Sequence, residues 1–378
     1  MKELEVKDIY SLIKENEREK KELDAIKKHI ENQPPTLLTQ RNEMYREFLF
    51  NDMHKDGYVM EYPHGTVVRQ SDRKWHYRGE NSCYPTSQPT FIRKLKNKSK
   101  EEREIAEFVA NLKLIHFFDI LNKLDHYHSF RNMHFTHSTN GTKVYLDVLH
   151  YNIAQHYGFD TNCLDITSDF EVALFFACCK YSDNKWAPLN QDDFEKNEES
   201  RYGRIFRREL NNYRNMMFPD EKYVVFPVGF QPFMRCHMQY SYAIFMEEDM
   251  DLNSSESGFE CLKFKHSEEL CNYIYSKMNN GVFIYPQEGL SVLSDELDAI
   301  QNSTCFSLES FRTIYNNLNF GYSESELIEL LKKAGIEIGR NITPITDSKI
   351  AIVNKHYEDF DVETLYDIKL RMRWIFTP

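Results

Sequence analysis

Hydrophobic and polar positions form an informative pattern along residues 155–177, which give the clearest structural prediction in the chain. Residues 155–157 complete the last turn of a helix, and Gly158 ends it because glycine accepts a positive φ without a Cβ clash. Residues 160–167 are polar with apolar anchors, whereas residues 172–179 are apolar on every side. This pattern predicts a polar loop held between one helix and a second, buried helix. Loops held in this way often carry functional groups.

Shorter patterns predict further helices and strands. Ser168 and Glu171 have the spacing of a capping box, which predicts Ser168 as the N-cap of the buried helix. Apolar positions at helical spacing predict a helix over residues 100–124 and two helices within residues 307–335. Runs rich in β-branched and aromatic residues predict strands over residues 74–79, 223–226, 243–245 and 281–285.

Together these elements predict an α+β fold with a small sheet flanked by many helices. We expect a helical N-terminal extension over residues 1–68, whose apolar spacing suits a helix that covers the core or a partner protein. The core domain is expected over residues 69–300, with a polar insertion or loop over residues 182–222. Residues 301–378 are expected to form a C-terminal helical part packed on the core.

Composition limits the compartments in which the protein is expected and the kinds of partner that it is expected to bind. The formal net charge of −12 argues against nonspecific coating of DNA, which needs a basic surface. The longest wholly apolar run, residues 172–179, is far shorter than the ~20 residues that span a membrane. No secretory leader pattern opens the chain, and its 8 cysteines contain no CxxC pair. We therefore expect a cytoplasmic protein with reduced thiols and no membrane contact.

The sequence lacks the motifs of several common classes of enzyme and nucleotide-binding protein. The sequence has no P-loop, no dinucleotide-binding GxGxxG and no GxSxG, so the folds that depend on them lose their main support. Histidines between residues 116 and 137 have no acidic or cysteine partner at metal-site spacing, so no metal is predicted. No pair of motif carboxylates points to a Mg²⁺-dependent nuclease.

Three motifs in order resemble the FRG domain family of bacteria and phages. Residues 155–177, QHYGFDTNCLDITSDFEVALFFA, are similar to the central signature of that family. Tyr77-Arg78-Gly79 matches the aromatic-Arg-Gly triplet that gives the family its name. Arg235 and Gln239, four apart and followed by YAIF, match a later element. The chain departs from the pattern after the loop threonine, where relatives commonly have a basic residue and this chain has Asn162.

The FRG family looks distantly similar to ADP-ribosyltransferases, whose small split antiparallel sheet binds NAD in a cleft. The resemblance implies NAD as the cofactor and implies catalytic roles for Arg78, which would clamp it, for His156, and for Gln239 at the late-strand position. It implies contacts to the nucleotide from Tyr77, Gly79, Tyr157, Thr161, Asp165, Thr167 and Arg235. The family pattern of the transferases has a late-strand Glu where this chain has Gln239, which cannot act as a base. Glu80 and Glu247 are the acids considered as substitutes.

The residues themselves leave alternatives open. Arg78 at a strand end suits a phosphate or a ribose, but equally suits a surface ion pair. His156 fits a site or a structural polar network, and Asp165 can be held by loop amides or by an arginine. The four-residue spacing of Arg235 and Gln239 places them on one face of a strand, and also on one face of a helix.

Two functions follow. The first is an effector or toxin, in a phage-related or defence setting, that transfers ADP-ribose from NAD to a protein or nucleic acid, or hydrolyses NAD. The alternative is a non-catalytic module that senses a nucleotide or a nucleic-acid end and signals through its helical parts. The missing acid favours the second function, and the dense set of polar residues favours the first.

Overall fold

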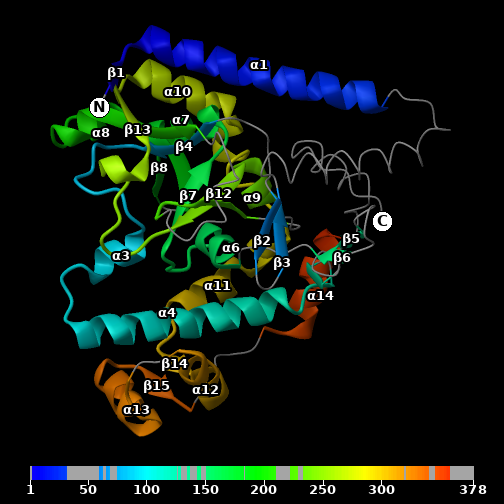
Figure 1. Cartoon of the computed structure of the whole chain (residues 1–378), viewed down its shortest axis with the longest axis vertical. Helices are drawn as coiled ribbons and strands as arrows, with labels where there is room; N and C mark the ends of the chain where they lie inside the picture. Colours follow the sequence, from blue (N-terminus) through cyan, green and yellow to red (C-terminus); the bar gives the residue numbers. More distant parts are fainter. Residues whose placement is uncertain are drawn as a thin grey trace.

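The computed structural model describes residues 2–31, 59–62, 65–68, 75–125, 127–128, 134–136, 143–145, 150–182, 184–209, 222–228, 233–318, 321–339 and 345–357. These residues form an α+β fold around a mixed sheet of seven strands (Figure 1). In spatial order the strands are β1 (Lys2–Leu4), β13 (Glu260–Lys265), β10 (Tyr202–Glu209), β4 (Trp75–Glu80), β7 (Cys163–Thr167), β12 (Ser241–Phe245) and β11 (Val225–Pro227). The β1–β13 pair is parallel, and the other neighbours are antiparallel.

Helices surround this sheet. The α-helices of the described residues are α1 (Val6–Glu31), α3 (Thr90–Leu95), α4 (Lys100–Leu121), α6 (His150–His156), α7 (Phe170–Cys178), α8 (Gln191–Phe194), α9 (Met234–Met238), α10 (Glu268–Lys277), α11 (Ser294–Gln301), α12 (Leu308–Asn317), α13 (Glu324–Lys333) and α14 (Asp347–His356). Two-stranded sheets pair β2 (Val59–Tyr62) with β3 (Gly65–Val68), β5 (His134–Thr136) with β6 (Lys143–Tyr145), β8 (Cys179–Ser182) with β9 (Lys185–Pro188), and β14 (Cys305–Phe306) with β15 (Glu337–Ile338).

The buried helix α7 packs against one face of the sheet and is itself covered by α10 and α1 (Figure 1). Apart from Glu171, its residues are apolar on every side, which fits a helix with protein all round it. On the far side of the molecule, the long helix α4 packs with α11 and carries the small unit of β14, α12, α13 and β15 on its outer surface. Among the described residues no helix is long and apolar enough to cross a membrane.

The sheet nearly comes apart between β4 and β7. Strands β10 and β4 pair along their full length, with 6 residue pairs, whereas β4 and β7 share the single pair Tyr77 and Thr167. Beyond that pair the two strands diverge. Side chains from both strands therefore face a gap in the middle of the sheet, and a cavity lies at this gap.

The structure confirms several of the sequence predictions. Helix α4 corresponds to the helix predicted over residues 100–124, and α12 and α13 are the two helices predicted near the C-terminus. Strands β4, β11 and β12 appear close to the predicted positions. The α+β class is also correct. The division into a core and two helical ends stays a prediction.

The prediction of a small split antiparallel sheet is wrong in size and in strand direction. Residues 182–222, predicted as a polar insertion or loop, contain β9 and the whole of β10, which lies near the middle of the sheet. Strand β10 looked like a loop because half its residues are charged. Those charges have partners on the neighbouring elements, since Arg204 pairs with Glu80 and Arg207 pairs with Glu260.

Other corrections are local. Residues 163–167 are strand β7 rather than loop, with Leu164 and Ile166 buried on one face. The N-cap of α7 is Asp169, whose carboxylate accepts from the amides of residues 171 and 172, and not Ser168. Residues 281–285, predicted as a strand, are not one: Asn279–Gly281 form a short 3-10 helix with positive φ at all three residues, and residues 282–285 are turn and bend.

The predicted helical extension over residues 1–68 is helical in α1, but residues 59–68 include the hairpin of β2 and β3. The rest of that extension, residues 32–58, lies outside the described residues, as do residues 358–378 of the C-terminal part.

Candidate functional site

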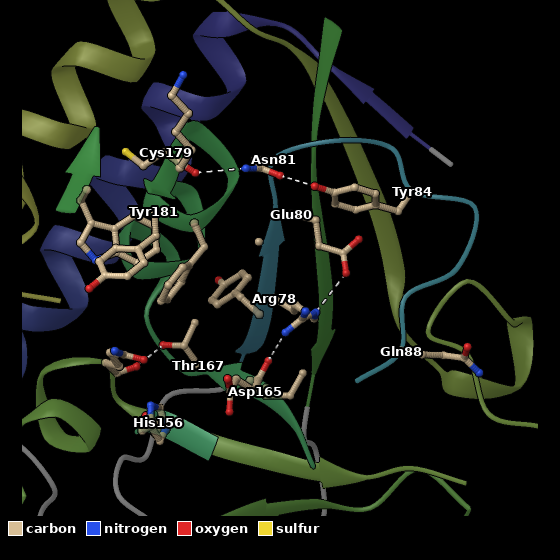
Figure 2. Close-up of a pocket in the computed structure, with 18 of the residues that line it drawn as sticks. Arg78, Glu80, Asn81, Tyr84, Gln88, His156, Asp165, Thr167, Cys179 and Tyr181 are labelled. Carbon is tan, nitrogen blue, oxygen red and sulfur yellow. Dashed lines mark hydrogen bonds and ion pairs between the residues drawn. The ribbon is translucent and has the colours of Figure 1, made fainter. Parts of the chain in front are cut away.

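A cavity of about 360 Å³ opens where β4 and β7 diverge (Figure 2). Its walls come from β4 and the segment after it, from β7, from α7, from the β8–β9 hairpin, and from the ends of α6 and α9. Of the residues expected to contact a ligand, the cavity brings together Tyr77, Arg78, Gly79, His156, Asp165, Thr167 and Gln239. The structure therefore gathers most of the residues of three separate motifs around one space.

Gly79 lets β4 lie directly on α7. A Cβ atom built at this position would lie 1.7 Å from the carbonyl oxygen of Ala173, which no side chain can accommodate. Tyr77, two residues earlier, is buried against Phe170 at the start of the same helix. The glycine of the aromatic-Arg-Gly triplet is thus needed for packing, and the close packing fixes the position of Arg78 between its two neighbours.

Arg78 is held from two sides. Its Nη1 donates to the backbone oxygen of Asp165 at 2.9 Å, across the gap between the strands, and its Nε donates to Glu80 at 3.1 Å (Figure 2). Its side chain keeps 23% of its surface exposed, so the outer edge of the guanidinium still faces the cavity. A planar cation fixed in this way is suited to a phosphate or carboxylate.

Glu80 is the carboxylate that orients this arginine. It is buried and accepts from Ser87 at 2.6 Å and from Arg204 as well as from Arg78. Burial by itself raises the pKa of Glu80, but the two guanidinium groups and the hydrogen bonds outweigh it, and the pKa lies below its usual value. Glu80 is therefore ionised and fully engaged, and it is not a free acid. Glu247, the other acid considered, is exposed and does not line the cavity.

His156 ends α6 at the floor of the cavity. Gly158 follows with φ of +87°, which stops the helix as predicted. The imidazole is buried, and its Nε2 has no hydrogen-bond partner among the described residues. Burial lowers its pKa, and nearby Arg235 adds to the effect, while Asp165 and Gln239 oppose it. The ring is therefore neutral at physiological pH and keeps an open nitrogen.

Asp165 lies on β7 with its side chain on the cavity side of the strand (Figure 2). Its one hydrogen bond from a described side chain comes from Asn152 at 3.5 Å, which is long. No described cation lies within ion-pair distance of its carboxylate. Neither alternative named for this carboxylate is seen among the described residues: no loop amide bonds to it, and Arg78 bonds to the backbone oxygen of Asp165 instead.

Arg235 supports the site from behind and does not line the cavity. It lies on α9, which shows that the segment with Gln239 is helical rather than extended. Its guanidinium is stacked between the rings of Tyr157 and Tyr285, at 4.5 and 4.1 Å from the ring centroids. Its Nη1 donates to the backbone oxygen of His156 at 2.6 Å. Arg235 thus helps to position His156, and neither Arg235 nor Tyr157 lines the cavity, so their contact with a ligand stays a prediction.

The threonines and Gln239 are largely occupied by the fold. Thr161 lies outside the cavity and bonds to Gln155 and to the amide of Cys163. The hydroxyl of Thr167 donates to the backbone oxygen of Gln239 and accepts from the amide of Asp169. The amide nitrogen of Gln239 donates to Ile284. These residues shape the cavity more than they offer free groups to it.

Sequence reasoning missed the aromatic wall opposite Arg78. Tyr181 and Trp186 lie on the β8–β9 hairpin with their ring centroids 5.1 Å apart, and Tyr181 is 47% exposed. A pair of aromatic residues flanking Asn184, which has a positive φ, is a hairpin signal that could have identified them. Ser241, also missed, lines the cavity, and its hydroxyl has no partner among the described residues. Gln88, missed too, borders the cavity, but its amide is directed away from it and donates to the backbone oxygens of Glu248 and Met250 (Figure 2).

Comparison with known proteins agrees with the resemblance seen in the motifs. The family model of the FRG domain matches residues 73–186. This chain contains an FRG domain. The matched residues run from β4 to the end of the aromatic wall, while Gln239 and Ser241, which complete the cavity, lie outside them. No curated protein and no solved structure matches the chain.

Proposed function

We propose that the FRG domain binds NAD in this cavity and uses it as a donor of ADP-ribose, which it transfers to a macromolecule or to water. The observation that carries the proposal is a set of unpartnered polar atoms around one cavity with a fixed cation. These atoms, which have no partner among the described residues, are His156 Nε2, Ser241 Oγ and Trp186 Nε1. Buried polar groups without partners are costly in a folded protein, and a polar ligand that bonds them removes that cost.

The chemical character of the walls fits a nucleotide. Arg78 offers a guanidinium edge to a phosphate, and the rings of Tyr181 and Trp186 offer a surface on which a planar base stacks. The volume of about 360 Å³ lies within the range of ~300–1,000 Å³ that small-molecule sites occupy. The gap lies between two diverging strands of a sheet, as in the cleft that the resemblance to ADP-ribosyltransferases implies.

In the proposed reaction the bond between ribose C1′ and the nicotinamide nitrogen breaks. The electron pair leaves with the nicotinamide ring, which becomes neutral, and the positive charge passes to the ribose. An oxygen or nitrogen of the acceptor then bonds to C1′ and gives up a proton. The neutral, unpartnered Nε2 of His156 is the group in this cavity placed to accept that proton.

The test is incubation of the purified protein with labelled NAD and a cell lysate, beside the Arg78→Ala variant. Arg312→Ala serves as the matched control because Arg312 is 56% exposed and pairs with Glu324 far from the cavity. We expect label on protein or nucleic acid, or free ADP-ribose, with the parent and with Arg312→Ala, and at least about a hundredfold less with Arg78→Ala. The absence of product and of any NAD-induced rise in melting temperature would contradict the proposal.

One observation favours the alternative, a nucleotide sensor without catalysis. Gln239 is neutral and already bonds to Ile284, and the Glu80 carboxylate is consumed by Ser87 and two arginines, so neither supplies a base. A sensor would bind NAD or a related nucleotide with loss of affinity in Arg78→Ala but would release no nicotinamide. Either function fits an effector that acts in a phage-related or defence setting, as the family resemblance suggests.

A further inference from the structure

Among the described residues, none provides a counter-charge for the carboxylate of Asp165, which lies on the cavity wall. Glu80, the other acid on the cavity wall, is neutralised by Arg78 and Arg204. Lys180, a cation on the opposite wall, is held by Asp193 at 2.6 Å and is therefore neutralised too. Asp165 has a long hydrogen bond from Asn152 and no ion pair with a described residue.

The surroundings of Asp165 explain why this charge stays available. His156 on α6 interacts electrostatically with Asp165 at the cavity floor (Figure 2), and burial lowers the pKa of that ring and keeps it neutral. Arg78 binds the backbone oxygen of Asp165, and Arg235 is stacked between two tyrosine rings behind the floor. The carboxylate thus faces a space with His156 Nε2 and Ser241 Oγ on its borders, and neither carries a charge.

We infer that Asp165 faces the positively charged nicotinamide riboside of NAD, selects the oxidised form of the dinucleotide over the reduced form, and stabilises the charge on the ribose as the glycosidic bond breaks. The inference rests on the proposed function. The nicotinamide ring is cationic in NAD and neutral in NADH, so a carboxylate beside it attracts one and not the other. As the bond breaks, the positive charge moves from the nicotinamide ring to the ribose C1′ and the ring oxygen of the ribose. The same carboxylate stabilises the charge at this second position too.

The experiment measures the affinity for NAD and for NADH of the parent protein and of Asp165→Asn, by calorimetry. Asparagine keeps the shape and an oxygen that accepts from Asn152, so the fold is preserved while the charge is removed. Asp165→Glu tests whether a charge at this position restores the effect. Asp160→Asn is the matched control, because Asp160 is five residues away, half-buried, and paired with Lys94 outside the cavity.

We expect the parent and Asp160→Asn to bind NAD at least tenfold more tightly than NADH. In Asp165→Asn the ratio should fall to about one, with nicotinamide release at least a hundredfold slower, and Asp165→Glu should recover part of the ratio. A merely structural role would weaken both ligands equally. An unchanged ratio in Asp165→Asn, or a parent that binds both forms equally, overturns the inference and leaves NAD binding intact. A parent that binds neither form overturns the proposed function itself.

Discussion

At the scale of single residues, Gly79 shows how close packing fixes the position of the neighbouring Arg78. The glycine brings β4 into contact with α7, and Arg78 beside it is thereby held against β7. The requirement is one of space, because the backbone of Ala173 occupies the place of a side chain. Backbone of a buried helix cannot move aside as the tip of a flexible side chain can.

We predict that Gly79→Ala lowers the free energy of unfolding by about 3 kcal/mol or more, since overpacking against backbone is at the upper end of its usual cost. Chemical denaturation followed by circular dichroism measures this change. Gly321→Ala is the control: φ there is +71°, but nothing lies within 4 Å of the added Cβ, so its cost is about 1 kcal/mol. Equal effects of the two substitutions would contradict the packing role of Gly79.

Single residues also show what the sequence can reveal of the site. Arg78, His156 and Asp165 stand in motifs with characteristic spacing, and the structure places all three at the cavity. Tyr157 and Thr161 stand in the same motif, yet they face the core and the loop backbone. Motif membership alone does not separate a residue that faces the ligand from one that orients its neighbour, because both are required for the same site.

At the scale of elements, α1 is attached to the core through a buried polar network at the start of α7. Lys20 lies 2.8 Å from Asp169 and 2.7 Å from Glu171, whose side chains are 0% and 3% exposed. Asn16 adds hydrogen bonds to the same two carboxylates. Lys277 of α10 also pairs with Glu171, at 2.5 Å. Two buried carboxylates side by side need these two cations and the donors of Asn16, so the network makes α1 part of the fold around α7.

We predict that Lys20→Ala lowers the free energy of unfolding by about 2 kcal/mol, less than for a wholly buried pair because Lys20 is 31% exposed. Lys7→Ala on the same helix is the control, and its midpoint should match that of the parent because Lys7 is 76% exposed. Limited proteolysis should also cleave α1 faster in Lys20→Ala. If Lys20→Ala behaves like Lys7→Ala in both assays, the network does not secure the helix.

The elements that the sequence predicted well are those whose pattern is local. Helix α4 begins with a capping box at Ser99 and Glu102 and has apolar positions along its length, so its position could be inferred from the sequence alone. The position of strand β10 could not be inferred, because its arginines look like solvent-exposed residues in the sequence. Their partners Glu80 and Glu260 are known only from the structure. Those partners come from distant parts of the chain, and no local sequence pattern predicts them.

At the scale of the whole molecule, the C-terminal helix is connected to the site through one buried acid. Glu288 accepts from the amide of Met234, the first residue of α9, at 2.9 Å. It also accepts from the hydroxyl of Tyr357, which follows α14, at 3.1 Å. The same acid therefore holds the helix that carries Arg235 and the last element that the structure describes. Its other carboxylate oxygen has no partner among the described residues.

Burial raises the pKa of Glu288 to about 8, despite the opposing hydrogen bonds from Met234 and Tyr357. In the unfolded chain a glutamate titrates near ~4.3. Between those values the folded state binds a proton that the unfolded state does not, so the stability contributed by this group falls as pH rises from about 4 to about 8. Above about pH 8 Glu288 is ionised in the folded state, and burial of its charge then lowers the free energy of unfolding by the full amount.

Glu288→Gln should remove this cost, because the amide keeps an acceptor for Met234 and Tyr357 and has no charge. We predict that the variant is more stable than the parent by on the order of 3 kcal/mol at pH 8.5, and that the difference shrinks towards pH 5. Thermal unfolding from pH 5 to pH 9 measures it. Burial lowers the pKa of three histidines, His116, His156 and His266. Their contribution to the stability of the protein falls as pH falls, opposite to that of Glu288. The contribution is the same in the parent and in the variant, so it cancels in the comparison. The exposed Glu256→Gln should follow the parent at every pH. A difference between Glu288→Gln and the parent that does not change with pH would show that Glu288 is ionised in the folded protein, with a counter-charge in reach.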